Sequence, residues 1–291
     1  MIDNIVLGDN QFIGVNHRSE MAGKEKAAYF QDVRNVIRTL EIAKENGAGG
    51  VMFSSVESIR DIVPEIIKNP RLKGFHIYPL IPYLMKYVDS LTRKGLSGTL
   101  ASLTSGGRGI ENVVRVVSTG IGGLRGDYTK VFEHLIDLEM ALFRGGAVKA
   151  VVLHNGVVDL MLGLGFDELF RFYDGYIRKK YSAIPAYGTL NLPLLVQKLK
   201  KCGFENPLIM SPVNACGFNM HSSVEACERT IAEGGFEHLA MNVFSSGAVK
   251  PKEAFEYLSR LKHIKHVVLG ASSEQHIKES FGLAKRQLNF S

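Results

Sequence analysis

The stretch Lys149-Ala150-Val151-Val152-Leu153-His154 is a short apolar run that ends in a histidine. A continuous run of this kind is typical of a strand buried on both faces, as in a parallel sheet. Similar runs recur on both sides of it, with enough residues between them for a helix. They predict seven further strands at residues 4–8, 50–54, 75–78, 183–187, 208–211, 238–243 and 265–270.

Segments with helical spacing separate these strands. Apolar residues recur every three or four positions from Phe30 to Ala43, and Asn46-Gly47 then supplies a stop. Further helices are predicted at residues 58–68 (kinked or started by Pro64), 128–144 (capped by Asp127), 192–201, 223–232 and 251–261, with a last one from about residue 273. The alternation predicts an α/β protein, a (β/α)8 TIM barrel formed as a single domain over residues 1–291.

A doubly wound open sheet shows the same alternation and is the second choice. Its glycine-rich dinucleotide turn is missing after the first strand, where Gly8-Asp9-Asn10-Gln11 stands. A long glycine-rich connection, residues 79–126, follows the third strand. Such a segment indicates either a lid over the substrate or an irregular insertion within the barrel.

Composition narrows the class of protein. The 291 residues are 45% hydrophobic and 22% charged, which suits one barrel of about 250 residues with a large core. The net charge of +6 is dispersed, which favours a small anionic ligand over nucleic acid. No run is apolar enough to span a membrane, no secretory signal is recognisable, and the three cysteines form no C-x-x-C pair. We therefore expect a cytoplasmic protein without a metal site, and its oligomeric state stays open.

Polar residues follow the predicted strands, at the end of a barrel where active sites lie. His154 ends an apolar strand and is the best acid–base candidate. The predicted catalytic residues are His154, Glu57 and Asn155, and the predicted substrate-binding residues are Asn10, Gln11, Tyr78, Asn214 and Asn242.

Two loops of small residues predict an anion site. Phe244-Ser245-Ser246-Gly247 follows the seventh strand, and Gly270-Ala271-Ser272-Ser273 leads into the last helix. Small residues let a ligand approach the backbone, and a helix N-terminus attracts phosphate. A plain helix cap by Ser272 or Ser273 would explain the second loop as well. The predicted cofactor-binding residues are Ser245, Gly247, Gly270, Ser272 and Ser273.

Val152-Leu153-His154, Ser211-Pro212-Val213-Asn214 and residues 266–280 together resemble the aldo-keto reductase superfamily, over about half of the chain. The resemblance implies a TIM barrel that binds NADP or NAD and reduces carbonyl compounds with an aspartate, a tyrosine, a lysine and a histidine. The histidine carries over to His154. Ser54 and Ser58 stand at the aspartate and tyrosine positions, and Tyr78-Pro79-Leu80 stands where the third strand would bring the lysine.

Three functional hypotheses follow. The first is a nicotinamide-dependent enzyme with altered catalytic residues that acts on a small carbonyl or sugar-like substrate. The second is a non-redox barrel enzyme, an aldolase, isomerase or lyase, that binds a substrate phosphate at the last two loops. The third is a catalytically silent ligand-binding protein on the same scaffold.

Overall fold

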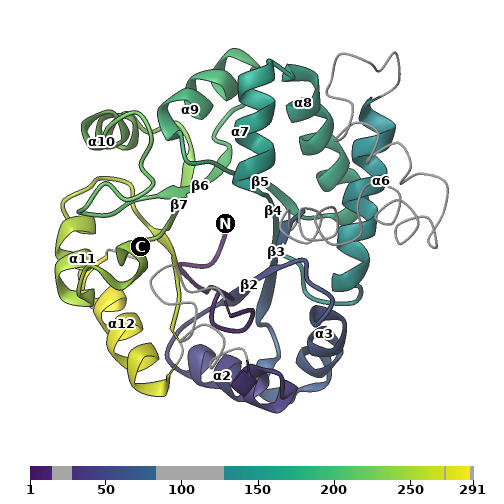
Figure 1. The fold of residues 1–291 in the computed structure, drawn as a ribbon, viewed down its shortest axis with the longest axis vertical. Helices are drawn as coiled ribbons and strands as arrows, with labels where there is room; N and C mark the ends of the chain where they lie inside the picture. Colours follow the sequence, from purple (N-terminus) through teal and green to yellow (C-terminus); the bar gives the residue numbers. More distant parts are fainter. Residues whose placement is uncertain (15–27, 83–127, 272, 289–291) are drawn as a thin grey trace.

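Eight parallel strands close into a barrel in which each strand pairs with its sequence neighbours and β8 pairs with β1. The computed structural model describes residues 1–14, 28–82, 128–271 and 273–288. Figure 1 shows the strands at the centre and the helices in a ring around them. The strands are β1 Ile5–Leu7, β2 Gly50–Ser54, β3 His76–Ile81, β4 Ala150–Leu153, β5 Ile184–Gly188, β6 Leu208–Pro212, β7 Glu237–Met241 and β8 His266–Leu269. The predicted TIM barrel is confirmed.

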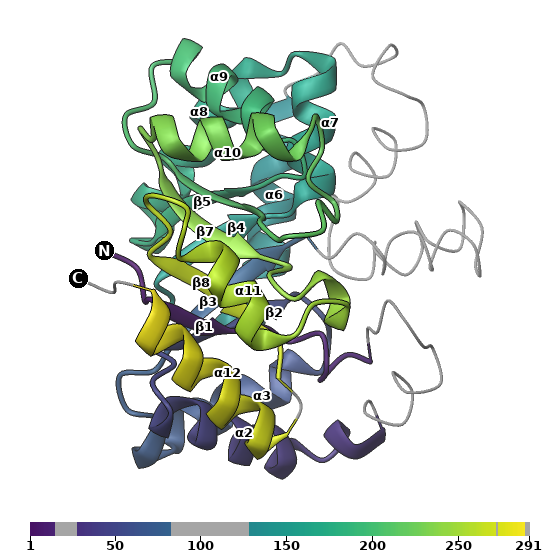
Figure 2. The ribbon, with the colours of Figure 1, turned by 90° about the vertical axis from the view of Figure 1, so that its left-hand side faces the viewer.

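The helices of the ring follow the strands along the chain, and in Figure 2 α2, α3 and α12 lie together at one side of the barrel. They are α2 Val33–Glu45, α3 Ile59–Lys68, α6 Tyr128–Met140, α7 Asn155–Leu164, α8 Asp167–Tyr176, α9 Leu192–Lys201, α10 Val224–Glu233, α11 Pro251–Leu258 and α12 Glu274–Gln287. No described helix is both long enough and apolar enough to cross a membrane.

Two helices between β4 and β5 do not appear among the predicted elements. In α7 the apolar side chains include Leu160 and Leu164, which are exposed, so no polar face interrupts the apolar one. Without that contrast the helical period disappears from the sequence. The helix ends at Gly165, whose φ of 72° is the left-handed conformation common at helix ends. A π-helical turn, Ile177–Tyr181, continues α8.

Two apolar layers build the core, and strand alternation separates them. Val6, Met52, Val152, Ala186 and Met210 belong to the cluster inside the barrel. Their strand neighbours Leu7, Phe53, Val151 and Ile209 belong to the larger cluster between the strands and the helices. Because residues two apart share a face, this division tells which side chain at a strand end points inward.

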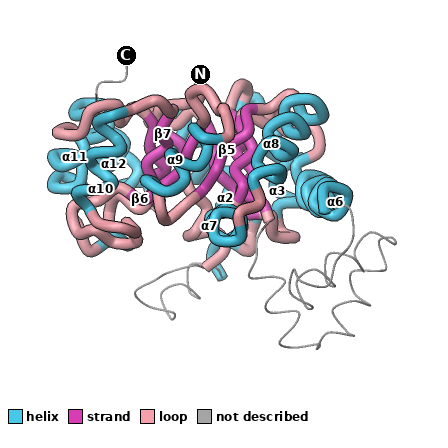
Figure 3. Tube along the Cα trace, turned by 90° about the horizontal axis from the view of Figure 1, so that it is seen from above, coloured by secondary structure: helices cyan, strands magenta, loops and turns pink. Residues whose placement is uncertain are grey.

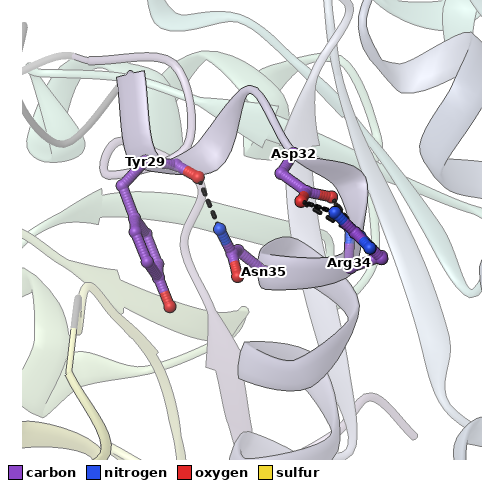
Figure 4. A network of polar contacts seen from close by, with 4 residues as sticks. All are labelled: Tyr29, Asp32, Arg34 and Asn35. Atoms are coloured by element: carbon purple, nitrogen blue, oxygen red, sulfur yellow. Dashed lines mark hydrogen bonds and ion pairs between the residues drawn. The ribbon is translucent and has the colours of Figure 1, made fainter.

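The start of α2 is fixed by local polar contacts (Figure 4). The Asp32 carboxylate accepts the Arg34 backbone N–H at 3.0 Å and pairs with its guanidinium at 2.6 Å. The Asn35 side chain donates to the Tyr29 carbonyl at 2.8 Å. The Asp32 contact satisfies a backbone N–H in the first turn of α2, as an N-cap does.

Some predicted segments fall partly or wholly outside the described residues, and one predicted helix ends earlier than expected. Residues 79–81 form the end of β3, and the remainder of the predicted lid at 79–126 lies outside the described residues from residue 83 onward. The predicted helix over residues 128–144 ends earlier, at Met140, and Ala141–Phe143 form a tighter 3₁₀ turn. Asp127, its expected cap, is also outside the described part of the chain.

Candidate functional site at the carboxyl ends of the strands

The mouth of the barrel comprises the carboxyl ends of the strands and the residues directly after them. In Figure 3 the N-terminus is at the top of the view, at the end of the barrel opposite the mouth. Continuing the inward positions of the strands by two residues gives the layer at the mouth. This layer includes Gly8, Ser54, His154, Gly188, Pro212, Met241 and Gly270. Among these residues His154 carries the titratable side chain.

Gly188 allows the strands to approach closely beside His154. A Cβ atom at this position would lie 2.9 Å from the Leu153 carbonyl oxygen and 3.1 Å from the Asn155 nitrogen. Any larger residue would push β5 away from the end of β4. The His154 backbone also joins the sheet, because its N–H donates to the Ile81 carbonyl at 2.7 Å. The imidazole thus extends from a rigid part of the barrel.

The His154 side chain caps α7. Its Nδ1 atom accepts the Gly156 backbone N–H at 3.1 Å. Burial lowers the pKa of the imidazole below its ordinary value, and the charge of Asp159 opposes this only in part. A neutral imidazole that accepts at Nδ1 carries its hydrogen on Nε2. His154 is therefore suited to donate a hydrogen bond at neutral pH.

Asp9, directly after β1, is a buried carboxyl that the sequence reasoning did not select as a site residue. Only 4% of the residue is exposed, and its Oδ2 atom accepts the Ser54 backbone N–H at 2.7 Å. Burial raises the pKa of the carboxyl to about 6, although hydrogen bonds from Ser54 oppose this rise. The signal in the sequence was the position of Asp9 at a strand end, which many polar residues share.

A second buried carboxyl group, that of Glu139, contacts Ser55 on the helix-facing side of β2. Its hydroxyl donates to the Glu139 carboxylate of α6, and both residues are fully buried. Ser55 follows the inward Ser54, so it faces the helices rather than the mouth. Glu139 lies in a predicted helix, but nothing in the sequence marked it as polar and buried.

The turn after β7 is strained and contains an unpaired hydroxyl. Asn242, Ser245 and Ser246 have φ values of 54°, 47° and 57°, a conformation that side chains other than glycine rarely adopt. Ser245 is 5% exposed, and its hydroxyl oxygen has no hydrogen-bond partner among the described residues. Gly247, with a φ of 86°, donates its N–H to the Phe244 carbonyl at 2.7 Å.

The loop after β8 meets the loop after β1. The Gln11 amide donates to the Gly8 carbonyl at 2.6 Å, and its other side-chain atom, Oε1, lies 3.8 Å from where a Cβ on Gly270 would stand. The structure thus brings the predicted residues Gln11 and Gly270 together. Ser273 accepts the His276 N–H at 3.2 Å and caps α12. This is the helix cap that the sequence offered as the alternative to an anion site. Ser272 lies outside the described residues.

Other predicted site residues have structural roles or point to solvent. Asn214 is buried and exchanges two hydrogen bonds with the Phe218 backbone, at 2.8 and 2.9 Å, so its amide holds its own loop. The Glu57 side chain is 81% exposed and pairs with Arg60 at 3.4 Å, so the structure does not bring it to His154. Asn10 is exposed, while Asn155 and Asn242 are half-buried.

The predicted place of Tyr78 in the substrate site is corrected by the structure. Its hydroxyl donates to the Asp3 carboxylate at 2.6 Å and accepts the Asp3 N–H at 2.9 Å. Asp3 precedes β1, so this hydroxyl lies at the amino ends of the strands. The prediction failed because Tyr78 lies in the middle of β3 rather than at its end. The strand continues through Pro79, which resembled a break in the sequence.

The described residues also contain an open groove outside the barrel, between α2, α3 and α12. Arginine and glutamate side chains, among them Arg34, Arg38, Glu41 and Glu274, line it. None of the predicted site residues lies there. Within the described part of the chain, no group of three or more histidine, cysteine, aspartate or glutamate residues is arranged to hold a metal ion.

No family model and no curated protein matches the chain by sequence. Solved structures match it across nearly its full length. A candidate aldo-keto reductase from Pseudomonas aeruginosa superposes with a TM-score of 0.62 at 11% identity, covering 98% of this chain and 90% of that one. The fold is that of the aldo-keto reductases.

Two further solved structures agree on the aldo-keto reductase fold. An aldo-keto reductase from a Medee basin deep-sea metagenome library gives a TM-score of 0.54 at 10% identity, covering 100% of this chain and 93% of that one. Aldose reductase from Giardia lamblia gives 0.51 at 11% identity, with 99% and 88% covered. The resemblance seen in the sequence is confirmed for the fold, and activity is a separate question.

Asp9 lies beside the strand end to which the sequence resemblance assigns the aspartate of the family. The resemblance places the aspartate of the family at Ser54, on β2. Here a carboxylate reaches the Ser54 backbone from the neighbouring strand end, through Asp9. The end of β2 therefore has a buried carboxyl beside it, although β2 itself supplies none.

Proposed function

We propose that this chain is an enzyme on an aldo-keto-reductase-like barrel that acts on a small carbonyl or sugar-like substrate. It binds a nicotinamide nucleotide, or another phosphate-bearing ligand, at the loops after β7 and β8, and its catalytic residues differ from those of the family. The observation that carries the proposal is the buried hydroxyl of Ser245, which lies in a left-handed turn and has no hydrogen-bond partner in the described part of the chain.

An unpaired buried hydroxyl and a left-handed serine both destabilise a protein. The first costs roughly 1–3 kcal/mol and the second about the same. Such costs concentrate at ligand sites, where the ligand supplies the missing partner. A phosphate oxygen is a strong acceptor for a serine hydroxyl. The start of α12, a helix of 14 residues, follows β8 and adds a second attraction for an anion.

The residues that would hold the ligand are Ser245 and Gly247 after β7, and Gly270 and Ser273 after β8. A nicotinamide nucleotide supplies or accepts a hydride when bound. His154 contributes a hydrogen-bond donor, because its neutral imidazole carries the hydrogen on Nε2 while Nδ1 is held by Gly156. That donor orients a substrate oxygen and stabilises negative charge developing on it.

One observation favours the second candidate, a non-redox lyase, aldolase or isomerase that binds a phosphorylated substrate. Ser54 and Ser58 stand where the resemblance expects the aspartate and tyrosine of the reductase, whereas burial raises the pKa of Asp9 to about 6. A carboxyl with such a pKa suits proton transfer, which these reactions require. The phosphate of the substrate would then occupy the Ser245 turn.

Titration with NADPH, NADH and inorganic phosphate tests the proposal. Nicotinamide fluorescence and thermal unfolding report binding, since a ligand at one hundred times its Kd stabilises the folded state by about 2.7 kcal/mol. We expect Ser245→Ala to weaken binding at least about tenfold, which corresponds to about 1.4 kcal/mol. Ser246→Ala, in the same turn, is the control and should change it little.

The three ligands separate the candidates. Saturable nucleotide binding that depends on Ser245 supports the reductase-like enzyme. Phosphate binding that depends on Ser245, without nucleotide binding, supports the non-redox enzyme. If no ligand binds, or if both serine variants bind as the unaltered protein does, the anion site at this turn is wrong.

A further inference from the structure

Asp9 has a contact that does not need a carboxylate. Its Oδ2 atom accepts the Ser54 N–H at 2.7 Å, which occupies a backbone donor at the end of β2. Its own carbonyl accepts the N–H groups of Phe12 and Ile13 and so starts the turn after β1. An asparagine would provide the same acceptor and the same turn. The fold therefore explains an acceptor at position 9 but gives no reason for an ionisable one.

A charge at this position is unfavourable. The residue is 4% exposed, and no arginine, lysine or histidine of the described residues forms an ion pair with it. Burial of a carboxylate without a cation costs several kcal/mol unless the group takes up a proton. Ionisable groups kept in such surroundings concentrate at functional sites.

The hydrogen-bond partner of Asp9 belongs to the mouth. Ser54 shares the inward layer with His154 and with the glycines at the ends of β1, β5 and β8. Gln11, two residues along from Asp9, bonds the Gly8 carbonyl and lies near Gly270. A small molecule bound above β1 and β2 would lie beside the end of β2, where the Asp9 carboxyl is bonded to the Ser54 backbone.

We propose that Asp9 is the acid–base residue of the mouth and exchanges a proton with an oxygen of a small carbonyl or hydroxyl compound bound above β1 and β2. When a carbonyl oxygen gains negative charge, the carboxyl O–H bond breaks, a new O–H bond forms on the substrate, and the carboxylate keeps the electron pair. In reverse, the carboxylate takes the proton of a hydroxyl group. This inference rests on the proposed function for its substrate class, and the proton step is common to both candidate reactions.

Glycidol, a small hydroxylated epoxide, tests whether Asp9 is a reactive group of the mouth. A carboxylate oxygen attacks the terminal epoxide carbon, the epoxide C–O bond breaks, an ester bond forms, and the alkoxide takes a proton from water. Peptide mapping by mass spectrometry locates the ester. We expect Asp9 to be esterified at least about tenfold faster than the buried Glu139, which faces the helices and serves as the internal control.

The pH dependence of labelling provides the second readout. Because the carboxylate is the nucleophile, the rate at Asp9 should rise with pH and level off above about 6. Asp9→Asn keeps the acceptor for Ser54 and should lose only this ester. If Asp9 stays unlabelled while exposed carboxyls react, or if Glu139 reacts as fast, the inference is overturned. Labelling of the unaltered protein decides this even where the variant does not fold.

The same experiment separates this inference from the proposed function. Ser245→Ala should be labelled at Asp9 at the same rate, because the two residues belong to different loops of the mouth. If NADPH and phosphate fail to bind while Asp9 is still esterified, the ligand site at Ser245 is wrong and the role of Asp9 is supported. If the ligands bind through Ser245 but Asp9 is not esterified, the ligand site is supported and the role of Asp9 is wrong.

Discussion

At the scale of single residues, burial shifts the pKa values of Asp9 and His154 in opposite directions. Asp9 loses its hydration as an anion, so its pKa is raised to about 6, whereas His154 loses its hydration as a cation, so its pKa is lowered. Residue type at a strand end can be read from the sequence. Burial at that strand end cannot, because it depends on the loops of neighbouring strands.

Asp9→Asn should stabilise the protein at neutral pH. A carboxyl whose folded pKa exceeds its unfolded pKa binds more protons when folded, so its contribution to stability is lost as pH rises through about 4 to 6. The amide is not subject to this loss. We expect Asp9→Asn to be more stable by about 2–3 kcal/mol at pH 7.5 and about equal at pH 4. Urea unfolding at both pH values checks this, and a gain independent of pH would contradict the assigned titration.

A pair of substitutions separates the two roles of His154. Asparagine is a good helix cap, so His154→Asn should keep the start of α7 within about 0.5 kcal/mol, whereas His154→Ala should lose about 1 kcal/mol. Both variants lack the Nε2–H donor, and both should lose turnover of the substrate by at least about a hundredfold. Unfolding and kinetic measurements on the same samples check the split. Full activity in His154→Asn would mean that the imidazole is only a cap.

At the scale of elements, a carboxylate on α6 holds the π-helical turn that follows α8. Asp137 accepts hydrogen bonds from Tyr176 and Tyr181, both at 2.6 Å, and from Lys180 at 2.5 Å. Burial opposes ionisation, but these donors keep the pKa of Asp137 below its ordinary value. The widened helical turn brings both tyrosines and the lysine to one side.

Asp137→Ala should therefore destabilise the protein more than removal of an ordinary surface carboxylate. Because the cluster is partly exposed, we expect a loss of about 1–2 kcal/mol rather than the full cost of three buried bonds. Glu65→Ala is the matched control, since its ion pair with Lys68 at 3.3 Å is exposed and should contribute little. Equal stabilities of the two variants in guanidinium unfolding would show that the cluster adds nothing.

Strands were more predictable than helices in this chain, for a physical reason. A strand buried on both faces is apolar at every position, and β4 shows this in Ala150–Leu153. A helix shows itself only when a polar face opposes an apolar one, which holds for α9 and fails for α7. The end of β3 was predicted too early, at Tyr78, because a proline such as Pro79 usually marks the end of a strand rather than its interior.

At the scale of the whole molecule, the two ends of the barrel differ in their polar contacts. At the amino ends, Tyr78 and His76 both bond the Asp3 carboxylate, at 2.6 and 2.8 Å. At the carboxyl ends lie left-handed residues, a buried carboxyl with a raised pKa, and a hydroxyl without a partner among the residues that the structure describes. In barrels generally, conserved residues at the amino ends serve stability and those at the carboxyl ends serve function.

Substitutions at the two ends should have opposite effects. Tyr78→Phe removes a donor and an acceptor that Asp3 uses, so we expect a loss of about 1–2 kcal/mol in stability and unchanged ligand binding. Ser245→Ala removes an unpaired hydroxyl, so the free protein should be equally or more stable while its ligand binding weakens. Thermal unfolding with and without NADPH or phosphate tests both. Weaker binding of NADPH or phosphate by Tyr78→Phe would show that Tyr78 contributes to the ligand site after all.

The candidate site was predictable as a region, and less so residue by residue. Ser245, Gly270 and His154 follow their strands, and the sequence indicates their place at the mouth. Asn214 and Glu57 do so too, yet one bonds its own loop and the other points into solvent. The direction of a loop side chain depends on tertiary contacts, which residue order alone does not contain.

The burial of Asp9 and His154 has a consequence for the energy of moving a proton across the mouth. In water the pKa of an aspartate carboxyl is about 3.9 and that of an imidazole is about 6.5. The difference of about 2.6 means that a proton strongly prefers the imidazole. Here the preference for the imidazole is weaker, because the pKa of Asp9 rises to about 6 while that of His154 falls. A substrate that bridges the two groups would therefore move a proton from the imidazole to the carboxylate at a lower cost than the same transfer has in water.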